Sequence, residues 1–442
     1  MSGDFGSAVL RKVTLRLVPF LLVLYVAAYL DRINVGFAAL QIKRDLGFPD
    51  AVYGLGASLF FVGYFLFEIP SNLVLERVGA RRWIARIMVT WGLVSAAMMF
   101  VRSAGPFYVL RFLLGAAEAG FFPGIILYLT YWFPPRERAR AISKFMTAST
   151  LAWILGGPVS GMILGLDGRA GLSGWRWLFL LEGIPSVLLA GAVLALLPDR
   201  PADARWLRPE EKEWLGAQLA IPAAAGRERG DLRAALGDPS VWRITLVYVL
   251  LSLGGYGFSL WLPQVLQAAW GGSTLSTGFL SAVPYIATAL SMIAIGTHSD
   301  RSGERRWHVA GPALAASLGL VLAGVSRRPE LALAALCLSA SGLFGGLGPF
   351  WALATERLSP RSAAGGIAFV NSVGKLGGFL GPYLVGLLKE GKDDYARGFA
   401  LLAGTLAAAA ILALTLRGAA PSAPPSSSGS PAPSPVACAA EK

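Results

Sequence analysis

Twelve long apolar runs restrict this chain to one broad class of fold. A helix needs about 20 apolar residues to cross a hydrocarbon core, and most of these runs reach that length. Hydrophobic residues make up 55% of the 442 positions and charged residues only 15%, a balance that a soluble protein of this size could not bury. We therefore expect an all-α polytopic membrane protein with twelve transmembrane helices. The runs lie at about 14–38, 52–75, 83–101, 106–133, 141–165, 175–197, 241–268, 276–297, 307–325, 331–354, 364–388 and 398–417.

The runs form two sets of six, separated by a polar segment. Residues 1–197 make the first half and residues 240–417 the second, joined by a linker at 198–239 that carries a short amphipathic helix near 208–219. Residues 418–442 are rich in alanine, proline and serine, a composition that is typical of a disordered tail. The first run is long and lacks a small-residue cleavage site, so we expect no cleavable signal peptide.

The two halves carry an internal repeat. Three separate features recur at one common offset of 224 residues, which indicates two homologous six-helix halves. Halves related by an axis along the membrane normal, with a site between them, are a transporter architecture. The repeated features are the segments that start at Glu76 and Asp300, the glycines Gly54 and Gly278, and the dipeptides Gly157-Pro158 and Gly381-Pro382.

The net charge of +13 is explained by membrane topology. If the N terminus lies in the cytoplasm, the segments on that side carry 26 lysines and arginines, those on the other side carry 10, and three lie inside the runs. Such a bias sets orientation by the positive-inside rule. We expect both termini in the cytoplasm, a bacterial-type inner (plasma) membrane, a lipid bilayer as the surrounding partner, and no nucleic-acid partner.

The repeated loop follows the pattern acid-Arg-x-Gly-x-Arg-Arg. A carboxylate at a helix end with three cations nearby could hold two helices together in one state of a transporter and release them in another. The alternative is a basic anchor on the cytoplasmic side that has no gating role. The residues expected to form this gating motif are Glu76, Arg77, Gly79, Arg81 and Arg82 in the first copy, and Asp300, Arg301, Gly303, Arg305 and Arg306 in the second.

Charged side chains also interrupt two of the apolar runs. Asp31 and Arg32 appear before the first run has spanned a bilayer, where charge costs at least about 2.5 kcal/mol per group and usually faces a cavity or a partner. Arg111, Gly115 and Glu118 share one helix face, and the glycine leaves room beside the backbone for a ligand. Each arginine could grip a carboxylate bidentately. Alternatively, the first helix ends at Asp31, or the charges form an ion-pair network that locks the two helices together.

The loop motif also carries a family resemblance. Residues 296–306 match the loop pattern G-x-x-x-D-R-x-G-x-R-R of the Major Facilitator Superfamily in full, whereas the first copy has Asn72 for the glycine and Glu76 for the aspartate. The stretches YLDRINVGFA, FEIPSNLVLERVGARRW, RFLLGAAEAGFFPG, GWRWLFLLEGIPS and NSVGKLGGFLGPYLVG resemble its anion:cation symporter family. The linker start LPDRPADARWL is similar to the phthalate and tartrate transporter branch of that family. The resemblance covers about residues 10–417.

This resemblance implies roles for the charged residues. In the family, an arginine of the first helix and one of the fourth helix bind the organic anion, and these correspond to Arg32 and Arg111. The neighbouring acids take protons, which assigns proton coupling to Asp31 and Glu118.

Three further polar residues are candidate substrate contacts. Tyr64 and Asn371 resemble substrate contacts of the family, although either could instead make a hydrogen bond between helices. Lys375 lies four residues after Asn371 on the same helix face. It is either a third cation for a dianion or a side chain that snorkels to the interface.

The sequence therefore predicts a secondary active transporter that takes up a small organic anion by proton symport. Candidate substrates are hydroxy acids, sugar acids and aromatic carboxylates such as tartrate or phthalate. The proton is the coupling ion, no other cofactor is expected, and we expect a monomer. The absence of a Walker loop argues against ATP drive, and two cysteines with two histidines suggest no metal site.

Other functions remain alternatives to this prediction. An exporter or antiporter is the first alternative, because Gly157-Pro158-x-x-Gly161 partly resembles the antiporter pattern of helix 5, with Met162 in the place of the second glycine. A membrane anion sensor would need a long folded output domain, and the linker and tail are short. An enzyme is not expected, because no nucleophile, base and orienting group converge in the sequence.

Overall fold

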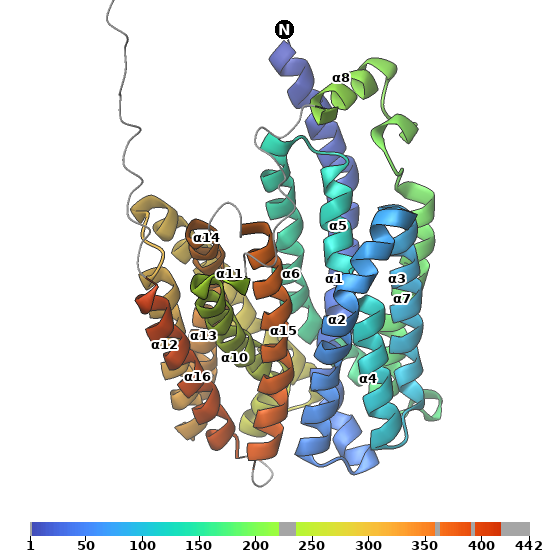
Figure 1. The fold of residues 1–442 in the computed structure, drawn as a ribbon. Coiled ribbons are helices and arrows are strands. Elements are labelled where there is room, and N and C mark those ends of the chain that lie inside the picture. The colour runs from blue at the N-terminus through green and yellow to red at the C-terminus, as the bar shows by residue number, and fades with distance from the viewer. Residues whose placement is uncertain (1, 221–235, 359–362, 390–393, 417–442) are drawn as a thin grey trace, which may run out of the picture.

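A computed structural model describes residues 2–220, 236–358, 363–389 and 394–416. Long helices form two bundles side by side (Figure 1), as expected for an all-α polytopic chain. The first bundle consists of α1 (Ser2–Leu46), α2 (Asp50–Val78), α3 (Ala80–Ala97), α4 (Ala104–Glu118), α5 (Phe121–Thr130), α6 (Pro135–Leu164) and α7 (Gly174–Leu196). The second consists of α10 (Pro239–Trp270), α11 (Thr274–Ser302), α12 (Trp307–Val325), α13 (Pro329–Gly345), α14 (Leu347–Arg357), α15 (Ala363–Leu388) and α16 (Ala396–Thr415).

The helices account for the predicted membrane crossings. Among the described residues, eleven segments are long and apolar enough to span a membrane, with α4 and α5 forming one of them and α13 and α14 another. The remaining predicted run is α15, which has 26 residues. This helix carries Asn371, Lys375 and several glycines. These are features of a helix that faces other helices rather than lipid.

Two expectations about helix ends need correction. The first helix extends from Ser2 to Leu46, well beyond the predicted 14–38, because a helix continues through polar flanks where nothing breaks it. The predicted run 106–133 is two helices, because Gly120 adopts a left-handed φ of 88°. A second break, between α13 and α14, occurs at the corresponding place in the other half.

The repeated glycines meet each other where the two halves touch. A Cβ on Gly54 of α2 would lie 2.8 Å from the carbonyl oxygen of Pro382 in α15. In the same way, a Cβ on Gly278 of α11 would lie 3.1 Å from the Cα of Gly161 in α6, and it would also meet the backbone of Gly157. Each half therefore packs its copy of one repeated feature against the other half's copy of the second feature. Backbones approach this closely only where side chains are small.

These contacts lie at the side of the molecule opposite the N terminus. α2 and α15 lie side by side there and diverge toward the side that carries the N terminus and α8 (Figure 1). At the same side the hydroxyl of Tyr53 in α2 donates a 2.8 Å hydrogen bond to the carbonyl of Leu260 in α10. The two halves are thus closed against each other at the side opposite the N terminus.

The linker begins with structure that packs on the first bundle. The helix α8 (Pro209–Ala220) lies where an amphipathic helix was predicted, and the Lys12 ammonium forms a 2.7 Å ion pair with its Glu211. Glu211 also accepts a 2.8 Å hydrogen bond from the backbone N–H of Arg208. Linker residues 221–235 and the predicted tail from residue 418 lie outside the described residues.

Candidate functional site

An ion pair between Arg32 of α1 and Glu118 of α4 forms the centre of the candidate site. Both side chains are buried, with 8% and 1% of their surface exposed. The guanidinium carbon of Arg32 lies 4.8 Å from the ring centre of Tyr29, 5.5 Å from that of Phe60 and 5.4 Å from that of Tyr64. Aromatic rings at such distances attract a cation. One carboxylate and three rings of the first bundle therefore hold this arginine.

The break between α4 and α5 positions the carboxylate. α4 ends at Glu118, and Ser71 of α2 donates a 2.7 Å hydrogen bond to the carbonyl of Ala119, directly after it. Gly120 turns the chain into α5, and a Cβ there would collide with the Ser71 side chain. Within the described part of the chain, Oε2 of Glu118 accepts no hydrogen bond, so this oxygen is available for a proton or for a donor on a ligand.

The second bundle contributes a cation to the same place. Nζ of Lys375 in α15 lies 4.8 Å from the ring centre of Tyr64, so cations from both halves approach one tyrosine. Asn371 lies one turn earlier on α15 and is half-buried, like Lys375. Nearby, the rings of Phe61 and Tyr256 meet across the two halves, with centroids 4.4 Å apart. The structure thus gathers Tyr64 and Lys375 with Arg32 and Glu118, at the junction where transporters of this architecture bind substrate.

Arg111 is the most enclosed of the candidate cations. Its side chain is fully buried between α2 and α4, where Nη2 donates a 3.3 Å hydrogen bond to the carbonyl of Ala57. Its guanidinium carbon lies 5.2 Å from the ring centre of Phe60, the ring that Arg32 also approaches. Neither Nε nor Nη1 has a hydrogen-bond partner among the residues that the structure describes. A buried guanidinium with two unused donors is costly, and an anion would satisfy it.

The space beside Gly115 is not a ligand site. We expected the glycine to leave room there, but a Cβ on Gly115 would meet the backbone of α2, including the nitrogen of Tyr64 at 2.9 Å. The glycine instead allows α2 and α4 to pack closely. A matching contact follows at Gly63, whose Cβ would lie 2.9 Å from the nitrogen of Ala116.

Asp31 lies apart from the cations that it was expected to serve. Its carboxylate accepts hydrogen bonds from Trp91 Nε1 at 2.9 Å, Ser95 Oγ at 2.5 Å and Ser186 Oγ at 3.0 Å. These donors belong to α3 and α7, whereas Arg32 contacts Glu118 of α4 and rings of α2. Consecutive helix residues point about 100° apart, so Asp31 and its neighbour Arg32 face different partners.

The polar cluster around Asp31 was not predicted from the sequence. Glu182 of α7 is also part of it, and one of its oxygens accepts a 3.0 Å hydrogen bond from Ser160 of α6. Asn34 donates to Asp31 at 3.5 Å. A signal was present in the sequence, because Trp91 and Ser95 of α3, like Glu182 and Ser186 of α7, are four residues apart and therefore share a helix face.

The two copies of the loop motif brace helices inside their own halves. Arg81 of the first copy hydrogen-bonds to the carbonyl of Leu194 in α7 and lies 3.4 Å from a carboxylate oxygen of Asp199. Arg305 of the second copy lies 2.7 Å from Asp300 and 3.2 Å from Glu356 of α14. The hydrogen bond to Asp300, together with that to Glu356, raises the pKa of the Arg305 guanidinium. These pairs join neighbouring helices of one half, at the side where α2 and α15 diverge.

The remaining residues of the loop motif lie at helix ends or at the surface. Gly79 and Gly303 both have positive φ, 95° and 67°, and end α2 and α11. Arg306 lies 3.7 Å from Glu304 in the loop. The exposed members are Glu76, Arg77, Arg82, Asp300 and Arg301.

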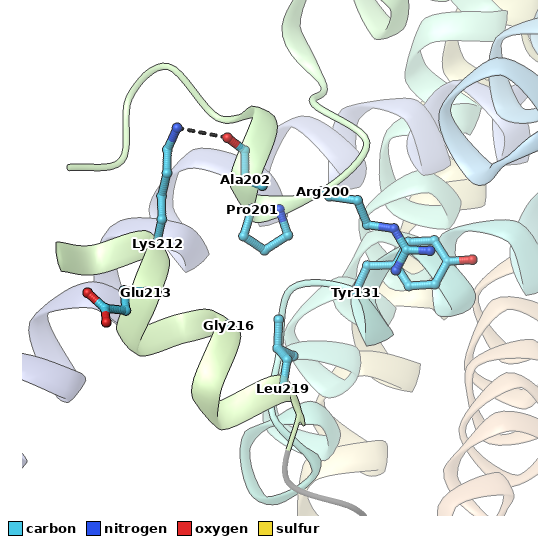
Figure 2. A pocket seen from close by; sticks show the side chains of 8 residues that line it. All are labelled: Tyr131, Arg200, Pro201, Ala202, Lys212, Glu213, Gly216 and Leu219. Carbon is cyan, nitrogen blue, oxygen red and sulfur yellow. Dashed lines mark hydrogen bonds between the residues drawn. The ribbon is translucent and has the colours of Figure 1, made fainter. Parts of the chain in front are cut away.

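A cavity of about 440 Å³ lies away from this site (Figure 2), beside α8 at the end of the molecule that carries the N terminus (Figure 1). Tyr131 and α8 line it, and the guanidinium carbon of Arg200 lies 3.8 Å from the ring centre of Tyr131. Lys212 donates a 2.8 Å hydrogen bond to the carbonyl of Ala202 across its rim. None of the residues that line it belongs to the candidate site, so we assign the cavity no part in substrate binding.

Two helical bundles with cations that converge from both halves are the architecture of a membrane transporter. The family profile of the Major Facilitator Superfamily matches residues 21–382, more than half of the chain. The chain therefore belongs to the Major Facilitator Superfamily and is a secondary transporter rather than an enzyme, as the sequence analysis expected.

Relatives of known description support the branch of the family. The chain is 48% identical over 422 residues to a protein of Agrobacterium vitis named "Putative tartrate transporter", covering 95% of this chain and 97% of that protein. It is 44% identical to the quinolone resistance transporter of Acinetobacter baumannii, covering 90% and 92% of the two chains. It is 37% identical to the inner membrane transport protein RhmT of Escherichia coli, covering 94% and 97%. The expected resemblance to the tartrate transporter branch is confirmed.

Solved structures confirm the fold. A bacterial homologue of the human lysosomal transporter Spinster, in an inward-facing and unoccupied conformation, aligns with a TM-score of 0.72 at 20% identity. The alignment covers 93% of this chain and 95% of the homologue. The xylose transporter XylE of E. coli, partially occluded and inward open, aligns with a TM-score of 0.69 at 14% identity, covering 90% and 97%. The predicted twelve-helix fold with two six-helix halves is thus confirmed.

Proposed function

We propose that this transporter takes up a small organic anion by proton symport. The proposal rests on the buried Arg32–Glu118 ion pair. Lys375 of the second half lies beside the ring of Tyr64, which Arg32 also contacts. A guanidinium in a site with little water binds a carboxylate strongly. Hydroxy acids, sugar acids and aromatic carboxylates fit this site, with tartrate favoured by the relatives from Agrobacterium vitis.

Glu118 supplies a mechanism for coupling. When it is ionised it occupies Arg32, so an incoming carboxylate must compete with it. A proton on Glu118 removes the competitor and frees the arginine for the anion. Proton and anion therefore favour each other's binding, and linkage makes this effect reciprocal. The carried proton also offsets the negative charge of the substrate during the crossing.

The other expected binding and coupling roles continue as parts of this proposal. Arg111 supplies its unused donors to the anion once the site rearranges, while Asn371 and Lys375 bind it from the second half. Asp31 serves as a second proton site, acting on the packing of α3 and α7 rather than on Arg32 directly.

The loop motif, the orientation and the oligomeric state complete the proposal. We infer that both copies of the motif brace their halves during the exchange of states, so that each half moves as a unit. The charge bias supports a bacterial inner membrane with both termini in the cytoplasm. Since substrate site and gate lie within one chain, a monomer suffices.

Uptake by purified protein in proteoliposomes tests the proposal. Labelled tartrate, phthalate and a sugar acid are supplied outside while an acid-outside pH step is imposed. We expect at least one of these anions to accumulate above its equilibrium level and to lose that accumulation when a protonophore is added. If folded protein moves none of them, the proposed substrate class is wrong. If movement is indifferent to the pH step, the proton coupling is wrong and the anion assignment stands.

Export or exchange is the second candidate function. The quinolone resistance transporter, at 44% identity, is the observation that favours it. Counterflow separates the two functions. An exchanger takes up labelled anion only when the vesicles contain unlabelled anion, whereas a symporter also takes it up into empty vesicles.

A further inference from the structure

A cluster of charges joins the two halves at the side opposite the N terminus. Asp50, at the start of α2, forms an ion pair with one lysine of each half. Nζ of Lys389, just after α15, lies 3.1 Å from Oδ2 of Asp50, and Lys43 of α1 binds Oδ1. Lys43 also donates a 2.9 Å hydrogen bond to Gln264 of α10. One carboxylate thus serves two cations, and the cluster carries a net positive charge where the halves close.

Aromatic rings of the second half hold Lys389. Its Nζ lies 4.6 Å from the ring centre of Tyr395 and 5.8 Å from that of Trp261. The indole N–H of Trp261 donates a 3.0 Å hydrogen bond to the carbonyl of Pro382, so this ring is fixed within the second half. Only 3% of the Lys389 side chain is exposed, so the closed structure keeps this cation from water.

When the two halves separate at this side, the charged residues of the cluster move with different halves. Lys43 and Asp50 both belong to the first half and move together as an ion pair. Lys389 moves with Tyr395 and Trp261 and loses the carboxylate of Asp50. A cation set among aromatic rings then faces the opening, and a carboxylate from solution restores the lost partner.

We propose that Lys389 is a capture site for a carboxylate of the transported anion when the side opposite the N terminus is open. The inference rests on the proposed function, since it assumes that an organic anion is transported. On closure, the carboxylate of Asp50 returns to Lys389 and displaces that of the anion. The anion then passes to the central cations Arg32 and Lys375. Asp50 thereby acts as a built-in competitor that makes capture reversible.

Two variants that break the same ion pair test this assignment. Lys389→Gln and Asp50→Asn both remove the contact between the halves, so both loosen the closed state. Only Lys389→Gln removes the proposed capture cation, whereas Asp50→Asn removes its competitor. We expect the KM for tartrate supplied from that side to be roughly tenfold higher in Lys389→Gln than in Asp50→Asn, the effect of one charge-assisted contact. Uptake is measured in right-side-out membrane vesicles at low and high salt.

Two further variants separate capture from general electrostatics. Lys389→Arg keeps the charge and should hold the KM within about twofold of the parent, because the cation is retained. Arg102→Gln removes an exposed cation on the same side and should leave the KM unchanged. The salt dependence of KM should weaken in Lys389→Gln alone.

The outcomes distinguish this inference from the proposed function. If Lys389→Gln and Asp50→Asn shift the KM equally and in the same direction, Lys389 only fastens the closed state and the capture site is refuted. If the parent protein transports no carboxylate, both proposals fail together. A tenfold difference between the two variants, with rescue by arginine, supports the capture site.

Discussion

At the residue scale, the structure reassigns the partners of the buried charges. The sequence predicted that Asp31, Arg32, Arg111 and Glu118 lie inside membrane helices, and all four are buried, since charge inside an apolar run is rarely accidental. It predicted the pairing less well, because adjacent positions suggested Asp31 with Arg32 and one helix face suggested Glu118 with Arg111. The observed pair is Arg32 with Glu118, which depends on how α1 crosses α4 and has no signature in either helix alone.

Glu118→Gln tests whether this carboxylate competes with the substrate. The neutral amide resembles the protonated acid, so tartrate affinity should equal the low-pH value of the parent and stop varying with pH. Accumulation driven by a proton gradient should be lost. The measurements are Kd against pH by calorimetry and uptake after a pH step. A variant that still concentrates tartrate would show that Glu118 is not an essential coupling site.

Asp31→Asn should behave differently, because Asp31 contacts donors of α3 and α7. An amide places its own N–H₂ among donors from Trp91, Ser95 and Ser186, which costs about 1–3 kcal/mol for a buried group left without a partner. We expect a melting temperature several degrees lower in detergent. We also expect tartrate affinity that still varies with pH, since Glu118 remains. An unchanged melting temperature would contradict this structural role.

Arg111→Lys keeps the positive charge but removes the planar guanidinium group. The two unused donors of Arg111 are the atoms proposed to bind the anion, and an ammonium cannot present them together. Tartrate affinity should fall about tenfold or more, the loss of one charge-assisted contact. The control is the chromatographic profile and melting temperature of the purified variant. Affinity equal to the parent would make Arg111 a purely structural residue.

At the element scale, the sequence predicted where the helices lie, but it did not predict where a helix is interrupted. Apolar length located the eleven spanning segments found among the described residues, because a bilayer leaves few alternatives to a helix, and it also located the run that forms α15. The break after Glu118 was missed, since one glycine inside an apolar run is tolerated in many unbroken helices. At this break Ser71 of α2 donates a hydrogen bond to the carbonyl of Ala119, a contact that the sequence of α4 and α5 does not reveal.

Gly120→Ala tests the importance of this break. Alanine at a φ of 88° is strained, and its Cβ would lie 2.7 Å from the Cβ of Ser71. We expect a stability loss of about 1–3 kcal/mol and weaker tartrate binding, because Glu118 moves with the turn. Gly346→Ala is the matched control at the corresponding break, where φ is −80° and an added Cβ would lie 3.3 Å from the carbonyl oxygen of His308, so alanine is much less strained there. Similar melting temperatures for the two variants would contradict the account.

At the scale of the whole molecule, the internal repeat explains how the halves close. The common offset indicated duplication, but it did not say that the repeated glycines would meet. In the structure Gly54 packs against Pro382, and Gly278 packs against Gly157 and Gly161, so the two contacts are related as the halves are. Because each half carries both repeated features, the same pair of features provides both contacts. Closure at the side opposite the N terminus therefore depends on backbone contact at two equivalent places.

Gly278→Val should accordingly bias the molecule toward opening at that side. The valine side chain would meet the backbone of α6, which cannot yield as a flexible side chain would. A cysteine introduced at Ser259, which is 5% exposed in this closed form, should react faster with an impermeant maleimide in right-side-out vesicles. The parent for this assay lacks Cys337 and Cys438. Gly404→Val is the matched control, since a Cβ there meets nothing within 4 Å. If both valine variants label alike, the glycine contact does not control closure.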